Sequence, residues 1–167
     1  PYAPANFTTT TNNSNGFVDT TGAPASITLS GGSNSSGSPG STRYLTTAAA
    51  TGPVSFDWIY QSVNDPSQHR FGYVLNGIFN QITNDNDGYQ EGLTSFNVTA
   101  GDSFGFQINT VDNYQGRASA TISNFNGPTG DPTVVPTPAL IPGLIGMGVA
   151  AWRKRKAEAE AGVTEEV

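Results

Sequence analysis

Three short segments concentrate the oxygen-bearing side chains that could bind a cation. They are Asn64 with Asp65, residues 84–87, and Asp112 with Asn113. Carboxylate and amide oxygens are the hard ligands that calcium prefers, although none of the three segments has the spacing of an EF-hand loop. Asp, Asn and Gly also build tight turns for purely conformational reasons. The sequence therefore raises calcium as a hypothesis and leaves ordinary turn chemistry as the alternative.

The residues that could support catalysis are few. His69 is the only histidine and sits in the polar stretch Gln68-His-Arg, where a solvated side chain is expected. Glycoside hydrolysis needs a pair of carboxylates at a defined separation, and Glu91 is the only glutamate before the C-terminal tail. We therefore expect a protein that is not an enzyme, with a jelly-roll carbohydrate-active enzyme as the alternative.

The composition indicates an exported, β-rich domain. Only 12% of the 167 residues are charged, whereas Gly, Ser, Thr and Asn are abundant. Cysteine is absent, which excludes disulfides, thiol nucleophiles and cysteine-based metal sites. Before the tail, three arginines stand against nine acidic residues. Such a domain repels phosphate backbones, so we expect no nucleic-acid partner.

Alternation of apolar and polar residues predicts a series of short strands. The predicted strands cover residues 17–20, 26–30, 43–50, 53–63, 71–75, 78–83, 92–99, 104–111 and 118–125. The strongest pattern, in 53–63, places four large side chains on one face: Val54, Phe56, Trp58 and Tyr60. A row of this kind is typical of a core, and stacking on carbohydrate from an exposed face is the alternative.

The connecting segments complete the fold prediction. Asn76-Gly77 between two apolar runs predicts a tight hairpin, residues 30–41 predict a flexible surface loop that buries nothing, and residues 1–11 predict an irregular arm or an edge strand. No helix is expected before Pro142. The fold class predicted is all-β: a single antiparallel, jelly-roll-like β-sandwich, followed by a Pro-rich linker and one short hydrophobic helix.

The C-terminal part of the chain combines an apolar run with a basic cluster. Residues 139–152 are followed at once by four cations, residues 153–156. A helix of this length spans about 21 Å, which is short against a hydrocarbon core of about 30 Å. The glycines of the run would let another helix approach closely. We expect this segment to be sorted or anchored at a membrane, or to pack in a bundle with the same segment of other copies. An ordinary buried helix is the alternative.

These composition shifts divide the chain into four parts. We expect a sandwich over residues 1–126, a linker over 127–138, a hydrophobic sorting or anchor helix with its basic cluster over 139–156, and a charged tail over 157–167.

The motif Pro136-Thr-Pro-Ala, the Gly-rich apolar run and the four cations resemble the PTPA variety of PEP-CTERM sorting signals, found on surface and matrix proteins of Gram-negative bacteria. The residues that carry the resemblance are Pro136, Thr137, Pro138, Ala139, Gly143, Gly146, Gly148, Trp152, Arg153, Lys154, Arg155 and Lys156. The resemblance implies export to the cell surface or extracellular matrix, and contact of the tail with a membrane or a sorting protease. Residues 157–167, which follow the basic cluster, depart from the family pattern.

Four sequence segments of the predicted sandwich are similar to segments of CUB-like domains that occur with this sorting signal. They begin at Phe56, Phe71, Asn97 and Ile122. This second resemblance assigns no activity. It implies that Asp65 and Asp112, with Asn113 beside it, are the first calcium ligands to test.

The expected function is that of an exported, non-enzymatic surface or matrix protein with a structural or adhesive role. Its expected partners are polysaccharide or further copies of the same chain. One alternative is a filament subunit held together by the tail helices or by residues 1–11 donated as a strand to a neighbour. The carbohydrate-active enzyme is the other.

Overall fold

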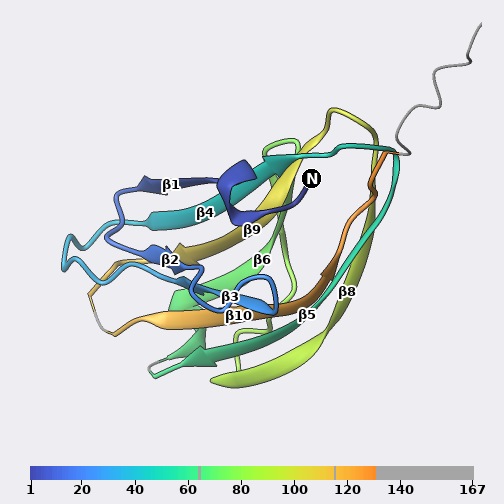
Figure 1. The fold of residues 1–167 in the computed structure, drawn as a ribbon. Coiled ribbons are helices and arrows are strands. Elements are labelled where there is room, and N and C mark those ends of the chain that lie inside the picture. The colour runs from blue at the N-terminus through green and yellow to red at the C-terminus, as the bar shows by residue number, and fades with distance from the viewer. Residues whose placement is uncertain (64, 115, 131–167) are drawn as a thin grey trace, which may run out of the picture. The chain divides into compact units, whose positions relative to one another are not determined.

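The computed structural model describes residues 1–63, 65–114 and 116–130. The residues from 131 onward lie outside this description, and with them most of the predicted linker, the sorting helix and the tail. The described part consists of two five-stranded antiparallel sheets packed face to face (Figure 1), as predicted. Its helical elements are two single 3₁₀ turns, η1 (Pro4–Asn6) and η2 (Pro66–Gln68). Within the described residues no helix has the length and apolar character needed to cross a membrane.

The two sheets, called sheet A and sheet B below, interleave strands from distant parts of the chain. Sheet A has the order β1 (Thr8–Asn12), β4 (Gly40–Thr47), β9 (Ser103–Thr110), β6 (His69–Leu75) and β7 (Ile78–Gln81). Sheet B has the order β2 (Phe17–Asp19), β3 (Ser26–Ser30), β10 (Ala118–Asn126), β5 (Gly52–Ser62) and β8 (Tyr89–Val98). Neighbouring strands in each sheet are antiparallel throughout.

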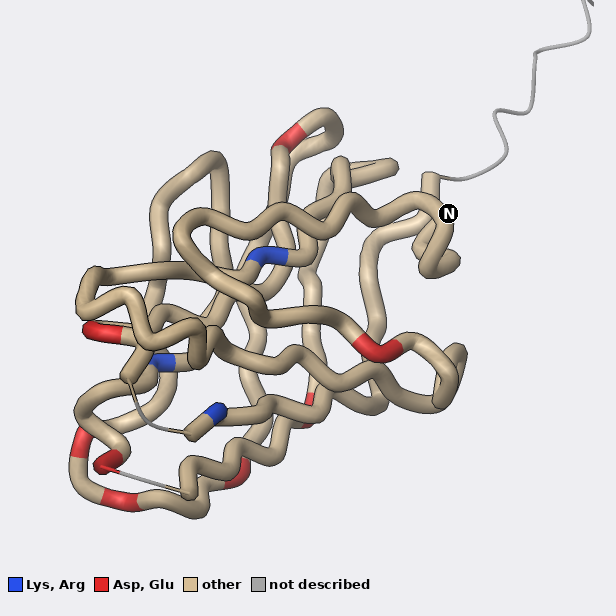
Figure 2. Tube along the Cα trace, turned by 90° about the vertical axis from the view of Figure 1, so that its left-hand side faces the viewer, with Lys and Arg blue, Asp and Glu red and all other residues tan. Residues whose placement is uncertain are grey.

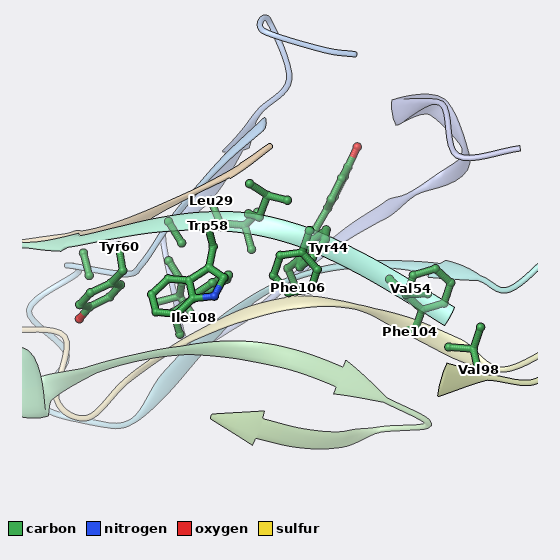
Figure 3. Close-up of a cluster of buried hydrophobic side chains, with 14 of the residues drawn as sticks. Leu29, Tyr44, Val54, Trp58, Tyr60, Val98, Phe104, Phe106 and Ile108 are labelled. Atoms are coloured by element: carbon green, nitrogen blue, oxygen red, sulfur yellow. The ribbon is translucent and has the colours of Figure 1, made fainter. Parts of the chain in front are cut away.

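The core forms between the facing sides of β5 and β9. The four large side chains of β5 are almost fully buried, with exposed fractions of 0% for Val54, Phe56 and Tyr60 and 7% for Trp58. From β9, Phe104, Phe106 and Ile108 project into the same space (Figure 3). The prediction that these four side chains of β5 belong to the core is thus confirmed. The alternative, that they stack on carbohydrate, is wrong because no ligand can reach them.

The N-terminal arm closes one side of the sandwich. The ring of Phe7 stacks on that of Tyr44 at a centroid distance of 4.5 Å. The hydroxyl of Tyr2 donates to the carbonyl of Pro128 (2.8 Å) and accepts from the amide of Ala49 (3.1 Å). Strand β1 then pairs along the edge of β4 in the same chain. The predicted edge strand is therefore present, and it completes the chain's own sheet A.

The turns follow the predictions in one place and depart from them in another. Asn76 and Gly77 both have positive φ angles, 49° and 83°, as the predicted β6–β7 hairpin requires. By contrast, Gly31 and Gly32 are buried, so the prediction that residues 30–41 bury nothing is wrong. A Cβ atom on Gly32 would lie 2.1 Å from Oδ1 of Asn113, so the missing side chain is what allows this close packing.

Candidate functional site

The side chains that point away from the core on sheet A form a continuous surface, called here the outer face of sheet A. Because side chains alternate along each strand, residues paired across strands form rows. The central row consists of Thr10, Arg43, Gln107, Gly72 and Gln81. On one side of it runs an apolar row of Leu45, Gly105, Val74 and Phe79, and on the other a polar row of Ser41, Asn109 and Arg70.

Gln107 lies at the centre of this face and is almost fully buried there. Its side chain is only 3% exposed, and its Nε2 donates to Oδ1 of Asn109. Its Oε1 is buried and has no protein hydrogen-bond partner. Gly72, which occupies the neighbouring place on β6, adds no side chain beside it. The amide oxygen at the centre of the face is therefore covered by its surroundings and left without a hydrogen bond from the protein.

Arg43, directly opposite Gln107 on β4, also lacks a protein partner. It is half-buried, its Nε is buried without a hydrogen bond, and no described residue pairs with its guanidinium. A buried polar atom left without a partner costs about 1–3 kcal/mol. Two such atoms in adjacent residues make this pair stand out from the rest of the surface.

Arg70, the other arginine of the face, is fully engaged. Its Nη2 lies 3.1 Å from Oδ2 of Asp85, and its Nε donates to Oδ1 of the same carboxylate. Gln81 donates to that carboxylate at 2.8 Å. Hydrogen bonds from Arg70 and then from Gln81 hold the pKa of Asp85 below its ordinary value. Arg70 is therefore neutralised and fixed, whereas Arg43 remains available.

The two sheets differ in charge. The strands of sheet A contain no Asp or Glu and carry Arg43 and Arg70, whereas the strands of sheet B contain no Lys or Arg and carry Asp19, Asp57 and Glu91. Charged positions are sparse along the described trace, so each of them matters locally (Figure 2). The carboxylate of Asp85, which lies beside the rows of the outer face of sheet A, is bound by Arg70 and Gln81, so the guanidinium of Arg43 can donate hydrogen bonds to hydroxyl or carboxylate oxygens of a ligand.

The outer face of sheet A thus combines planar polar groups with an apolar strip. Ligand sites generally pair apolar contact surface with a few well-placed polar groups that fix orientation. Here the amides and guanidinium of the central row can exchange hydrogen bonds with a hydroxyl-rich ligand. The half-buried Leu45 and Phe79 beside them can pack against its C–H groups. From β4 to β7 the rows extend over about 14 Å, three strand spacings.

The carboxylates predicted as calcium ligands both shape turns. Oδ1 of Asp65 accepts from the amide of Ser67 (2.9 Å) at the start of η2, and hydrogen bonds from Ser67 lower the pKa of Asp65. Oδ1 of Asp112 accepts from the amide of Tyr114 (3.0 Å). Within the described residues, no three His, Cys, Asp or Glu side chains come together as a metal site.

Asn113, the third predicted ligand, is fully buried. Its Nδ2 donates to the carbonyls of Asn13 (3.0 Å) and Ser38 (2.8 Å), which ties together three loops at one end of the sandwich. Its Oδ1 is buried without a protein partner. The positive φ of Asn113, 59°, is typical of a turn residue. Calcium binding by these residues stays a prediction.

His69 is not solvated, so that expectation is wrong. It is 2% exposed at the start of β6, and burial lowers the pKa of its imidazole. The ring is covered by the loop before β4, since a Cβ on Gly31 would lie 3.5 Å from its Cδ2. No described carboxylate hydrogen-bonds to the ring, and Glu91 lies on the outer side of sheet B. The arrangement has none of the geometry of a catalytic triad.

A hollow lies beside the N-terminal arm. Its volume is about 620 Å³, and its walls come from the arm, the β2–β3 connection and the end of β10. Tyr44, Phe106 and Phe125 line it together with prolines 4 and 24, so it is largely apolar. It offers few polar groups that could orient a ligand.

The predicted sorting residues, 136–156, lie outside the described part of the chain.

Fold and surface together define an antiparallel β-sandwich of the jelly-roll type with a polar sheet face. No protein-family model matches the chain, its C-terminal motif included, and no curated protein does. Similar solved structures include a family 35 carbohydrate binding module from Clostridium thermocellum (13% identity, TM-score 0.40, 68% of this chain and 90% of that one). A CBM35 from Paenibacillus barcinonensis has 12% identity and a TM-score of 0.35 over 72% of this chain and 94% of that one.

A third similar structure is the secreted serine protease VesC from Vibrio cholerae, with 16% identity and a TM-score of 0.44 over 76% of this chain and 26% of that one. All of these TM-scores are below 0.5. The likenesses therefore agree with the sandwich architecture but carry no argument about what this chain binds.

Proposed function

We propose that the sandwich is a non-catalytic module that binds polysaccharide on the outer face of sheet A and serves a structural or adhesive role in an exported surface or matrix protein. The observation that carries the proposal is the guanidinium of Arg43, which is half-buried, has no protein partner among the described residues and lies beside the amide of Gln107. Hydroxyl groups of a sugar can accept hydrogen bonds from the guanidinium, and a rotation of the Gln107 side chain would bring its amide oxygen within reach of a hydroxyl donor.

The surroundings of this pair support the same ligand class. Gln107, Asn109 and Arg70 are held in place by hydrogen bonds, so little side-chain freedom is lost when a ligand binds. The central row crosses all five strands of the sheet, which suits an extended chain better than a compact metabolite.

The test is affinity electrophoresis of the full-length protein in gels containing neutral or uronate-bearing polysaccharides. Arg43→Ala should weaken retardation by the bound polymer about tenfold or more, because a hydrogen bond to a charged group contributes about 1.5–3 kcal/mol. Gln81→Ala should weaken it less. The matched control is Gln61→Ala, which makes the same change on the outer side of sheet B and should leave retardation unchanged.

Two results would contradict this proposal. One is retardation that Arg43→Ala does not change while Gln61→Ala reduces it, since the ligand would then lie on sheet B. The other is release of reducing sugar from the bound polymer by the purified protein, which would favour the alternative hypothesis of a carbohydrate-active enzyme.

For the C-terminal part, we propose that residues 136–156 act as a sorting or anchoring signal. The support is the order of proline motif, apolar run and basic cluster in the sequence. Mass spectrometry of the mature C-terminus tests this proposal. Cleavage near Pro136 or recovery of an intact tail in the membrane fraction would agree with it, whereas an intact tail on protein that remains in the cytosol would contradict it.

A further inference from the structure

The outer face of sheet B carries an exposed apolar patch with acidic groups, called here the β5–β8 patch. It consists of Ile59, Tyr89 and Leu93, which are 41%, 56% and 73% exposed, together with Asp57 and Glu91. The residues are contiguous, because Ile59 pairs with Glu91 and Asp57 pairs with Leu93 on the adjacent strand. Large exposed apolar side chains gathered in this way are a mark of interaction surfaces.

The two carboxylates of the β5–β8 patch have neutral neighbours only. Glu91 accepts from the hydroxyl of Tyr89 at 2.7 Å, and Asp57 accepts from Nδ2 of Asn124 at 2.6 Å. Neither is in a salt bridge, since the ion pair found within the described residues joins Arg70 to Asp85. A partner for this patch should therefore combine apolar contact surface with a cation.

The outer face of sheet A of another copy has both properties. It presents the free guanidinium of Arg43 beside the half-buried Leu45, with the half-buried Phe79 at the other end of the same apolar row, on strands that contain no acidic residue. A sheet face of this size measures roughly 600 Å² from strand length and spacing, so stacking two faces would bury roughly 1,200 Å² in total. That is the lower end of the range for specific protein–protein interfaces.

We propose that this chain self-associates head to tail, with the outer face of sheet A of one copy stacked on the β5–β8 patch of the next. The contact joins two different surfaces, so each added copy leaves one of each free and the assembly can grow into a chain. The proposal goes beyond polysaccharide binding, involves neither the tail nor an exchanged N-terminal strand, and places Arg43 against Asp57 and Glu91 of its neighbour.

Sedimentation velocity of the full-length protein tests the proposal. We expect sedimentation coefficients that rise with protein concentration at low salt and fall at high salt, where charges are screened within about 3 Å at 1 M. Glu91→Arg should weaken association at least tenfold, and so should Arg43→Glu. The double variant Arg43→Glu with Glu91→Arg should regain association, because the two charges are exchanged across the contact.

Two control variants show whether the effect of Glu91→Arg is specific to this contact. Asp87→Arg makes nearly the same charge change in a loop and should associate like the wild type. Leu93→Asp alters an exposed residue that the core does not need, and it should also weaken association. Thermal unfolding of each variant shows that it is folded.

Three outcomes would overturn the proposal. They are a monomer at every concentration, association that Glu91→Arg and Leu93→Asp leave unchanged, and association that is lost when Arg153, Lys154, Arg155 and Lys156 are replaced by Gln. Polysaccharide binding is judged separately, because Glu91→Arg should retain it. Failure of the polysaccharide-binding proposal would therefore be distinguishable from failure of the stacking contact.

Discussion

At the residue scale, the side chains of β5 divide sharply by direction. Phe56 is fully buried and meets Phe106 edge to face at a centroid distance of 4.9 Å, whereas Ile59 points outward. Phe56→Ala should lower the free energy of unfolding by about 3–5 kcal/mol, since the truncation leaves a cavity in a packed core. Ile59→Ala serves as the control and should cost less than about 1 kcal/mol. Urea denaturation of both variants checks this; equal losses would contradict the assignment of faces.

His69 should make the protein less stable in mild acid. Burial lowers its pKa in the folded state below the ordinary 6.5, so the unfolded chain binds a proton more readily there. The free energy of unfolding should therefore fall as pH drops below about 6.5. Urea titrations on both sides of that pH measure the slope, and His69→Gln should reduce it. A slope unchanged by His69→Gln would count against the buried neutral imidazole.

Tyr60 should limit stability at high pH. Burial raises its pKa to about 12 from an ordinary 10.0, and its hydroxyl donates to the carbonyl of His69 at 2.7 Å. The unfolded chain loses this proton first, so stability should decline between about pH 10 and pH 12. Tyr60→Phe should lessen the decline while costing about 1 kcal/mol at neutral pH through the lost hydrogen bond. Denaturation midpoints across that pH range provide the measurement.

At the element scale, the N-terminal arm connects separate parts of the sandwich through one hydroxyl. Tyr2→Phe removes the hydrogen bonds to the carbonyl of Pro128 and from the amide of Ala49, so it should lower the free energy of unfolding by about 1–2 kcal/mol. Tyr114→Phe, at an exposed position, should change it by less than about 0.5 kcal/mol. A Tyr2→Phe variant as stable as the wild type would show that the arm is held by its ring contacts alone.

The strands were predictable where the pattern is local. In β5, four buried side chains alternate with more exposed ones within seven residues, and in β9 three apolar side chains, Phe104, Phe106 and Ile108, alternate with Gly and Gln. Strand β4 begins at Gly40, not at the predicted Arg43, because its whole length pairs with β9. Its first residues are Gly, Ser and Thr, whose burial depends on neighbours from other parts of the chain. Local alternation cannot reveal that.

The candidate site was not predictable for the same reason. Arg43 and Gln107 become neighbours only through the pairing of β4 with β9, which follows from the order of strands in sheet A. His69 sits in a polar sequence and is nonetheless buried, because glycines of a distant loop cover it. The Asp and Asn clusters stand out in the sequence, but their described side chains have other tasks: Asp65 and Asp112 accept backbone amides in turns, Asp85 pairs with Arg70, and Asn113 ties three loops together. Composition alone does not distinguish that role from metal binding.

At the scale of the whole molecule, charge is segregated between two faces of one sandwich. The cations of sheet A and the acids of sheet B lie on opposite sides of a shared core. The described domain is acidic overall, yet because of this segregation it offers one surface suited to oxygen-rich ligands. Both proposals follow from this asymmetry. They differ in the partner that contacts Arg43.

Chemical-shift mapping tests the central claim most directly. The amide signals of isotope-labelled protein would be followed while the polysaccharide that retards it in gels is added. Our account predicts that the signals of Arg43, Gln107 and their neighbours on β4, β9 and β6 shift together and saturate with one affinity. Shifts confined to β8, or to the loops around Asn113, with β4 and β9 unchanged, would contradict it.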